Sequence, residues 1–202
     1  MISVPPVPAS VPRAHGTLVA GFGRLALTLA GWRIEGNFPD SAKFVLIVVP
    51  HTSNWDFPVG LMAKFALHLG CRFIAKHSLF WWPLGAFLRK VGGLPVNRAA
   101  ASDFVAQTAS KFAERASLVL VITPEGTRSR VEKWKSGFHR IAHAAGVSIV
   151  LAVFDYRAKV VRLGPAFPAT DDYEGDLAKM QSHISAQMAK HPARYGQQRG
   201  LI

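Results

Sequence analysis

Short, continuous apolar runs alternate along the chain with longer stretches in which apolar residues recur every three to four positions. The runs are bounded by turn-forming residues and are typical of strands that are buried on both faces of a sheet. The longer stretches have the period of amphipathic helices. Strands that alternate with helices in this way indicate one α/β domain in which helical layers cover a sheet. We expect strands at 43–49, 72–75, 94–96, 118–122, 148–154 and 159–163, and helices at 17–32, about 55–69, 79–89, 102–115, 136–145 and about 171–190.

The N-terminal part of the chain separates into a tail and a helix. Residues 1–16 are rich in proline and are expected to form a flexible tail. The helix expected at 17–32 either packs on the rest of the protein, residues 33–202, or lies on a bilayer as a membrane-surface anchor. No apolar stretch reaches the roughly 20 residues that a spanning helix needs. The large apolar residues that share one face of this helix are Leu18, Phe22, Leu25, Leu29 and Trp32.

Composition and charge narrow the class of protein. The chain has 202 residues, of which 50% are hydrophobic, and a formal net charge of +12. A chain of this kind can bury a full core, which excludes a disordered protein. Basic residues gather between Asp56 and Asp103, where there is no acidic residue, and again at 128–140. Such an excess attracts anionic partners, whether nucleic acid, lipid headgroups or phosphorylated small molecules.

The cysteine and histidine content argues against a metal site. A single cysteine, Cys71, can form neither an internal disulfide nor a cysteine cluster, and we expect it to be a small core residue of a strand. His139 and His143 lie four positions apart on an expected helix, a spacing that can chelate zinc. Because there is no obvious third ligand, we interpret this segment as an ordinary amphipathic helix and expect no metal.

The strongest candidate for catalysis is the segment His51-Thr-Ser-Asn-Trp-Asp56, which follows the expected strand at 43–49. Positions five apart point away from each other on a regular helix, so His51 and Asp56 meet only if the chain turns between them. The intervening residues 52–54 are of turn-forming and helix-capping types. A carboxylate that pairs with an imidazole stabilises the imidazolium that forms when the histidine takes a proton. We interpret the pair as a general base; a structural hydrogen bond is the alternative.

A second polar turn, Pro124-Glu-Gly-Thr-Arg128, follows the expected strand at 118–122. Gly126 permits a backbone conformation that is closed to other residues, and Arg128 offers a planar fork for phosphate or carboxylate. Glu125 could accept a substrate hydroxyl or hold Arg128 in place. Another strand end, Asn97-Arg98, supplies a further arginine. Taken alone, the turn at 124–128 could equally be a surface loop with a local ion pair.

In their order and approximate spacing, these segments resemble the 1-acyl-glycerol-3-phosphate acyltransferase family of phospholipid synthesis. Residues 51–56 match the family's His-x4-Asp motif, and residues 123–129 match its Glu-Gly-Thr-Arg motif. Asn97-Arg98 matches the arginine motif between them, and the segment from Lys135 is similar to the one that follows the second motif. The resemblance runs from about residue 33 to 167. It implies that residues 33–202 form an acyltransferase domain with a mixed, mostly parallel sheet flanked by helices.

The resemblance also implies roles for single residues. His51 would be the general base that deprotonates an acceptor hydroxyl, and Asp56 would orient it. The hydroxyl would then attack an acyl thioester, so that acyl-coenzyme A or an acyl carrier protein would be a co-substrate and no other cofactor would be needed. The expected place of action is the cytoplasmic face of the cytoplasmic membrane. The residues implied in binding a lysophospholipid acceptor are Arg98, Glu125, Gly126, Thr127, Arg128 and Lys135.

Two departures from the family pattern leave the acceptor open. Thr123 stands where the family usually has an aromatic residue, and Val147–Leu151 replaces a proline-containing strand. A different hydroxyl acceptor, such as a lyso-aminolipid, is therefore one alternative. A basic nucleic-acid-binding protein and a membrane scaffold are others. Nucleic acid is not expected as a partner, because Trp81 and Trp82 cluster in an apolar stretch and do not interleave with basic residues.

Overall fold

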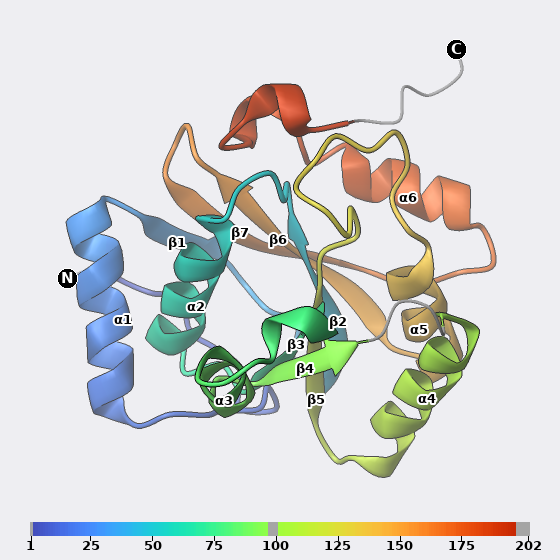
Figure 1. Cartoon of the computed structure of the whole chain (residues 1–202), viewed down its shortest axis with the longest axis horizontal. Helices are drawn as coiled ribbons and strands as arrows, with labels where there is room; N and C mark the ends of the chain where they lie inside the picture. The colour runs from blue at the N-terminus through green and yellow to red at the C-terminus, as the bar shows by residue number, and fades with distance from the viewer. Residues whose placement is uncertain (1, 97–100, 197–202) are drawn as a thin grey trace.

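A seven-stranded sheet separates two helical layers in the computed structural model, which describes residues 2–96 and 101–196 (Figure 1). The strand order is β1-β7-β6-β2-β5-β3-β4. All neighbouring strands are parallel except β6 and β7, which are antiparallel. The mixed, mostly parallel α/β sheet predicted from the sequence is therefore confirmed. The strands are β1 (Arg33–Gly36), β2 (Lys43–Val49), β3 (Cys71–Lys76), β4 (Gly93–Val96), β5 (Leu118–Ile122), β6 (Ser148–Asp155) and β7 (Val160–Phe167).

The helices cover both faces of this sheet. Helices α1 (Thr17–Ala30) and α2 (Asp56–Ala66) lie on one face. Helices α4 (Ala101–Glu114), α5 (Gly137–Ala145) and α6 (Tyr173–Gln181) lie on the other. The short α3 (Leu84–Lys90) packs beside β4. Three 3-10 turns complete the described elements: η1 (His77–Leu79), η2 (Ala186–Met188) and η3 (Pro192–Arg194).

The central strand β2 shows how an apolar run becomes a buried strand. Successive side chains of a strand point to opposite faces. Phe44 and Leu46 accordingly join the core under α1 and α2, whereas Val45 and Ile47 join the core under α4, α5 and α6. Each face of β2 therefore has an apolar layer of its own, which explains why the run is continuous and does not alternate with polar residues.

The direction in which strands are added reverses next to β2. The chain leaves β2 through α2 toward β3 on one side, and leaves β5 through α5 toward β6 on the other side. The helices that follow β2 and β5 therefore lie on opposite faces of the sheet. In open α/β sheets, ligands bind at such a switch point.

The structure corrects the bounds of two predicted helices and adds one strand that was not predicted. The helix predicted at 171–190 ends at Gln181, and the chain continues through η2 and η3 across the carboxyl edge of the sheet. The helix predicted at 79–89 begins only at Leu84, because Pro83 stands at its N-cap. Strand β1 was not predicted at all, since only Ile34 of its four residues is buried and no apolar run marks it.

The proline-rich segment at the N-terminus is also different from the flexible tail that we predicted. Val11 is buried in the core formed with α1 and α2. The backbone N–H of Ile2 donates to Oγ1 of Thr28 in α1, and Gly70 donates its N–H to the carbonyl of Pro12. The segment therefore packs along both helices. Its apolar residues between the prolines are what bind it there.

Candidate active site

His51 and Asp56 meet at the carboxyl end of β2, as the sequence predicts. Nδ1 of His51 lies 2.9 Å from Oδ2 of Asp56, with side-chain exposures of 14% and 2%. The two atoms lack the alignment of a hydrogen bond, so this is a close contact between the imidazole and the carboxylate. Poor alignment of this kind is common in catalytic pairs without bound substrate. The pairing of Nδ1 with the carboxylate leaves Nε2 as the ring nitrogen that can take a proton from another group.

The two oxygens of Asp56 have different partners. Oδ2, which faces His51, also accepts the backbone N–H of Ser53 at 3.0 Å, as expected of a turn closed by a carboxylate at a helix start. Oδ1 accepts the hydroxyl of Tyr156 at 2.7 Å. Burial, together with this bond to Asp56, raises the pKa of Tyr156 far above its usual value, so the phenol keeps its proton and stays a donor. The carboxylate is thus buried but satisfied, which fixes it relative to His51.

Glu125 lies behind the backbone of His51. Its Oε1 accepts the backbone N–H of His51 at 2.9 Å, so the turn after β5 holds the loop after β2. Glu125 is 3% exposed, and Oε2 has no hydrogen-bond partner in the part of the chain that the structure describes. Burial raises the pKa of Glu125 to about 7, and the bond from His51 only partly offsets this. In this geometry Glu125 fixes the backbone of His51.

The second turn reaches the surface after Glu125. Gly126 has a φ of 65°, a left-handed conformation that a glycine adopts without strain, and the side chain of Lys135 packs against it. The backbone N–H of Lys135 donates to the carbonyl of Pro124 at 3.0 Å and so returns the loop to the turn. Thr127, Arg128 and Lys135 are all exposed.

Arg128 in the second turn and Lys135 after it place positive charge at the surface. Among the described residues, neither Arg128 nor Lys135 forms an ion pair with a carboxylate. Both side chains are thus available to an anionic ligand, and the arginine fork suits a phosphate. Arg98, the other arginine predicted to bind the acceptor, lies outside the described residues.

Sequence reasoning missed the contribution of residues 186–195. The carbonyl of Met188 accepts the N–H of Tyr156, and the N–H of His191 donates to Oγ1 of Thr52. Tyr195 is buried near Glu125, and burial together with that carboxylate raises the pKa of Tyr195 above its usual value. This segment therefore holds the loop that carries His51. No pattern in the sequence indicates these contacts, because they join positions far apart in the chain.

A second histidine–aspartate pair, His139 with Asp176, lies elsewhere in the fold. Nε2 of His139 is 3.0 Å from Oδ2 of Asp176, and both side chains are buried between α5 and α6. Burial alone would raise the pKa of Asp176, but bonds from His139 and Thr170 outweigh it and lower this pKa to about 2. Nε2 of His143, the other residue with zinc-chelating spacing, lies 3.1 Å from Oδ1 of Asp171. The described residues include no cluster of three potential metal ligands. We interpret the His139–Asp176 pair as structural.

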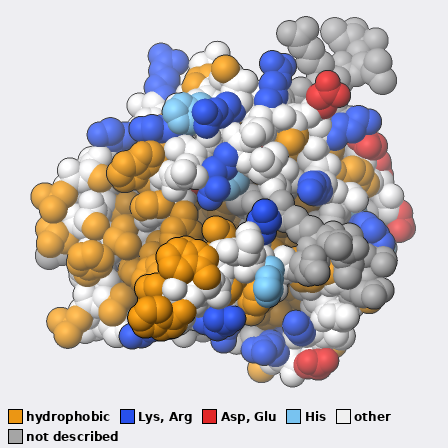
Figure 2. Space-filling model, viewed as in Figure 1, with side chains coloured by type: hydrophobic (Ala, Val, Ile, Leu, Met, Phe, Trp, Pro, Cys, Tyr) orange, Lys and Arg blue, Asp and Glu red, His pale blue; other side chains and the backbone are white. Residues whose placement is uncertain are grey.

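The surface around the site combines basic and apolar side chains. Figure 2 shows lysines and arginines around the centre of this face, with apolar side chains gathered over α1 and the region of α3. None of the described helices has the length and apolar character needed to cross a membrane. The exposed apolar residues on α1 are Leu18, Phe22, Leu25 and Leu29. Trp55, next to Asp56, is also exposed, and those on and before α3 are Leu79, Trp81, Trp82 and Phe87.

Comparisons with known proteins agree with this geometry. Residues 32–154 match the family model described as Acyltransferase, a span that includes both polar turns. A similar solved structure is the 1-acyl-sn-glycerophosphate (LPA) acyltransferase PlsC from Thermotoga maritima, with a TM-score of 0.56 and 18% sequence identity. The alignment covers 82% of this chain and 74% of that one. At this identity the likeness concerns the fold alone. A search of curated proteins finds no match.

Proposed function

Because the chain belongs to the acyltransferase family, we propose that it transfers a fatty acyl group from an acyl thioester to a hydroxyl of a lysophospholipid, such as 1-acyl-glycerol-3-phosphate. One observation carries the proposal. His51 is paired with a buried, doubly anchored carboxylate at the carboxyl edge of the sheet, beside exposed cations. A neutral imidazole in that position can take a proton from a hydroxyl, and the cations can hold an anionic acceptor.

The proposed reaction uses no covalent enzyme intermediate. Nε2 of His51 takes the proton of the acceptor hydroxyl as the oxygen attacks the thioester carbonyl. The resulting imidazolium is stabilised by Asp56. The tetrahedral intermediate then expels the thiolate, which receives the proton from His51. An ester and a free thiol are formed, and the histidine returns to its neutral state.

Acceptor binding is assigned to the second turn and its neighbours. Arg128 and Lys135 would contact the acceptor phosphate, with Arg98 as a further ligand from the end of β4. Gly126 and Thr127 would lie along the glycerol part. The side chain of Glu125, by contrast, is buried. It would therefore support the site through its bond to the backbone of His51.

The acyl donor and the membrane complete the set of proposed partners. Acyl-coenzyme A and acyl carrier protein both carry phosphates, and the net charge of +12 attracts either of them. No other cofactor has a role in the reaction. The exposed apolar face of α1 would lie in the interface of the cytoplasmic membrane, on its cytoplasmic face, where lysophospholipid is available.

Thiol release from a long-chain acyl-coenzyme A, with lysophosphatidate as acceptor, tests the proposal directly. We expect turnover by the wild type and a loss of about 10²–10⁴ in rate for His51→Ala, since a general base contributes about this much. His143→Ala is the matched control, because His143 lies on α5 and pairs with Asp171. This variant is expected to keep wild-type activity. Equal turnover by His51→Ala would refute the mechanism.

A second candidate acceptor follows from Thr123, which departs from the family pattern next to the turn. If lysophosphatidate is not acylated, a panel of lyso-aminolipids and other hydroxyl acceptors should restore thiol release. The mechanism would then stand with a different acceptor. If no acceptor gives thiol release, with either acyl-coenzyme A or acyl carrier protein as donor, the proposed function is rejected.

A further inference from the structure

The loop at 123–136, which joins β5 to α5, contains no helix or strand. It holds the second turn near one end and enters α5 at the other. A loop places charged side chains accurately only where contacts from outside fix its backbone. The position of its cations therefore depends on the residues that anchor it. The exposed cations of this loop are Arg128, Arg130, Lys133 and Lys135.

Helix α6 anchors the end of this loop that leads into α5. The phenol of Tyr173, the first residue of α6, donates to the carbonyl of Trp134 at 3.3 Å. Trp134 is buried, directly precedes Lys135, and packs edge to face on Phe138 of α5. Burial, together with the neighbouring Glu174, raises the pKa of Tyr173, so the phenol keeps its proton and stays a donor.

The start of α6 is fixed in turn by the buried His139–Asp176 pair. Oδ2 of Asp176 lies 3.0 Å from Nε2 of His139 and also accepts the N–H and the hydroxyl of Thr170, at 2.7 and 2.9 Å. Tyr173 lies one helical turn before Asp176, and the centroid of its ring lies 5.1 Å from that of His139, edge to face. His139 belongs to α5. The pair therefore joins the helix that follows the loop to the helix that donates to it.

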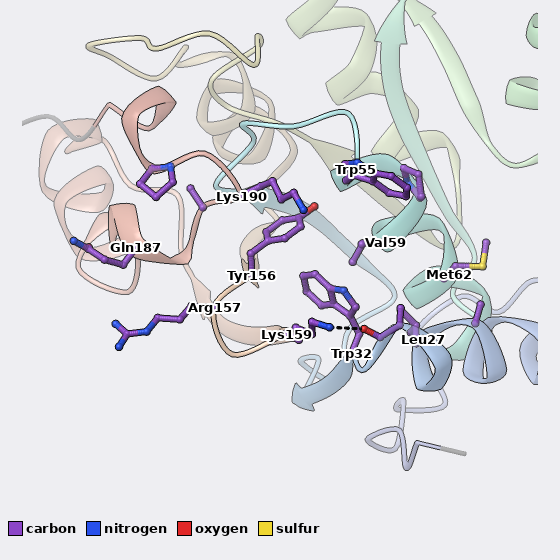
Figure 3. A pocket seen from close by; sticks show the side chains of 15 residues that line it. Leu27, Trp32, Trp55, Val59, Met62, Tyr156, Arg157, Lys159, Gln187 and Lys190 are labelled. Atoms are coloured by element: carbon purple, nitrogen blue, oxygen red, sulfur yellow. Dashed lines mark hydrogen bonds between the residues drawn. The ribbon is translucent and has the colours of Figure 1, made fainter.

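The other end of α6 leads into the segment that holds the site loop. After α6 the chain runs through residues 186–195, which bond to Thr52 and to the backbone of Tyr156. Figure 3 shows Lys190 of this segment beside the ring of Tyr156, at the wall of a cavity of about 640 Å³. Tyr173 does not line that cavity. A substitution at Tyr173 therefore tests the loop at 123–136 and leaves the wall of the cavity in place.

We propose that Tyr173 and the His139–Asp176 pair position Lys135 for the acceptor phosphate, and thereby set the affinity for the acceptor. This inference rests on the proposed function, in which Lys135 contacts that phosphate. Because Lys135 follows Trp134 directly, a shift of the Trp134 carbonyl moves the backbone of Lys135. The pair acts one step further away, since it holds the turn that carries Tyr173 against α5.

The proposed role concerns acceptor binding and not the chemical step. His51 is bonded near the other end of the loop, where Glu125 accepts its backbone N–H. We therefore expect Tyr173→Phe to raise KM for lysophosphatidate about two- to tenfold, the net worth of one hydrogen bond, and to leave kcat unchanged. A fall in kcat at unchanged KM would place Tyr173 in the chemistry and overturn the proposal.

Isothermal titration calorimetry with 1-decanoyl-glycerol 3-phosphate, below its micelle concentration, measures the affinity without turnover. We expect Tyr173→Phe and Lys135→Gln each to weaken binding about two- to tenfold. The double variant should bind no more weakly than Lys135→Gln alone, because effects of residues in one chain of contacts are not additive. Losses that add up fully would show that Tyr173 does not act through Lys135.

Trypsin cleavage of the folded protein follows the loop itself, because its cations are trypsin sites. We expect Tyr173→Phe to be cut between residues 128 and 135 about two- to tenfold faster than wild type, since the rate tracks the detached fraction. Ser182→Ala is the matched control, because it removes a hydroxyl that donates to the carbonyl of Lys179 at the C-cap of α6. Equal cleavage of the two variants would show that the bond to Trp134 does not hold the loop.

The His139–Asp176 pair is tested by two substitutions at His139. His139→Leu removes the partner of Asp176 and should weaken binding at least as much as Tyr173→Phe does. His139→Gln keeps an N–H for Asp176 and should restore most of the affinity. Thermal melting checks that both fold, and Tyr173→Phe, which keeps its ring, decides the question if His139→Leu does not. Wild-type affinity in a folded His139→Leu would exclude the pair from positioning.

Failure of this inference and failure of the proposed function are distinguishable. If the wild type does not bind the decanoyl probe, the inference is overturned. If the probe binds and the variants behave as expected, but no acceptor gives thiol release, only the proposed reaction is rejected. Binding and cleavage are both measured without turnover.

Discussion

At the scale of single residues, each member of the His51–Asp56 pair is held by a side chain from a distant part of the chain. Tyr156 binds Asp56 from the end of β6, and Glu125 binds the backbone of His51 from the turn after β5. The local motif predicts that His51 and Asp56 can meet, since the turn between them is encoded within six residues. The two supports depend on which strands neighbour β2, which the motif does not contain.

Tyr156→Phe removes the hydroxyl and leaves the ring in place. A hydrogen bond to a charged group contributes about 1.5–3 kcal/mol, so we expect kcat/KM to fall about tenfold or more with little change in KM. Without its donor, the Asp56 carboxylate attracts the proton of the pair more strongly. The acid limb of the pH–rate profile should therefore move to higher pH, which rate measurements between pH 5 and 9 will show. A lower rate with an unmoved profile would mean that Tyr156 has only a structural role.

Glu125→Gln tests the buried carboxyl group. Its pKa of about 7 in the folded protein exceeds the unfolded value of 4.5, so the folded state binds the extra proton. The contribution of Glu125 to stability is therefore full below pH 4.5 and is lost as pH rises to about 7. Glutamine keeps an oxygen for the N–H of His51 and has no charge. We expect the variant to exceed wild type by about 2 kcal/mol in unfolding free energy at pH 8 and to gain nothing at pH 4.

Urea unfolding of both proteins at several pH values measures this difference. The other titrating groups are the same in both proteins, so their contributions cancel in the difference in unfolding free energy. A difference that does not change between pH 4 and pH 8 would show that the Glu125 carboxyl group is not perturbed in the folded state.

At the scale of elements, strands follow from the sequence more closely than helix ends do. Strands β2 and β5 have the predicted bounds, because an apolar run buried on both faces has few alternatives. The end of α6 at Gln181 depends on contacts between residues 186–195 and the site loop, which lie outside any local pattern. The same holds for β1, where pairing with β7 decides the conformation of a mostly exposed segment.

The contact of α1 with α2 depends on a missing side chain. A Cβ at Gly23 would lie 2.7 Å from both the N of Ala66 and the carbonyl oxygen of Met62, so the helix backbones touch there. We expect Gly23→Ala to lower the unfolding free energy by about 1–3 kcal/mol, because the helices must separate. Gly21→Ala in the same helix meets nothing within 4 Å and should raise it by about 0.5–1 kcal/mol. Denaturant unfolding of the two variants compares them. Equal effects would show that α1 is not packed on α2 in solution.

At the scale of the whole molecule, one layer is unusually apolar on its outside. Helix α1 buries Leu27 against the core but leaves Leu18 and Leu29 at 89% and 80% exposure. The sequence left two interpretations of this helix open, packing on the domain and lying on a bilayer. In the structure the inner face of α1 packs on the core and its outer face is exposed. Packing on the domain and lying on a bilayer are therefore compatible. What the helix pattern could not show is the packing of the proline-rich segment, which depends on both helices being in place.

Leu18→Glu combined with Leu29→Glu tests the outer face. Transfer of a leucine side chain from water to an apolar medium is worth about 1.5–3 kcal/mol, so we expect at least tenfold weaker binding to vesicles that contain anionic lipid. The matched control, Gln107→Glu with Ala178→Glu, adds the same charge to exposed positions of the other layer. Flotation of protein with vesicles measures binding. An equal loss in both double variants would show that net charge alone governs attachment.

The contacts between residues 186–195 and the loop at 51–56 also set an order of events during synthesis. A ribosome makes His51 early, but the bonding partners Met188 and His191 emerge only after more than a hundred further residues. Until they arrive, the hydroxyl of Thr52 and the backbone N–H of Tyr156 lack these partners. A nascent chain that has already folded its sheet should therefore remain inactive, which spares the cell an unfinished enzyme that acts on lipid.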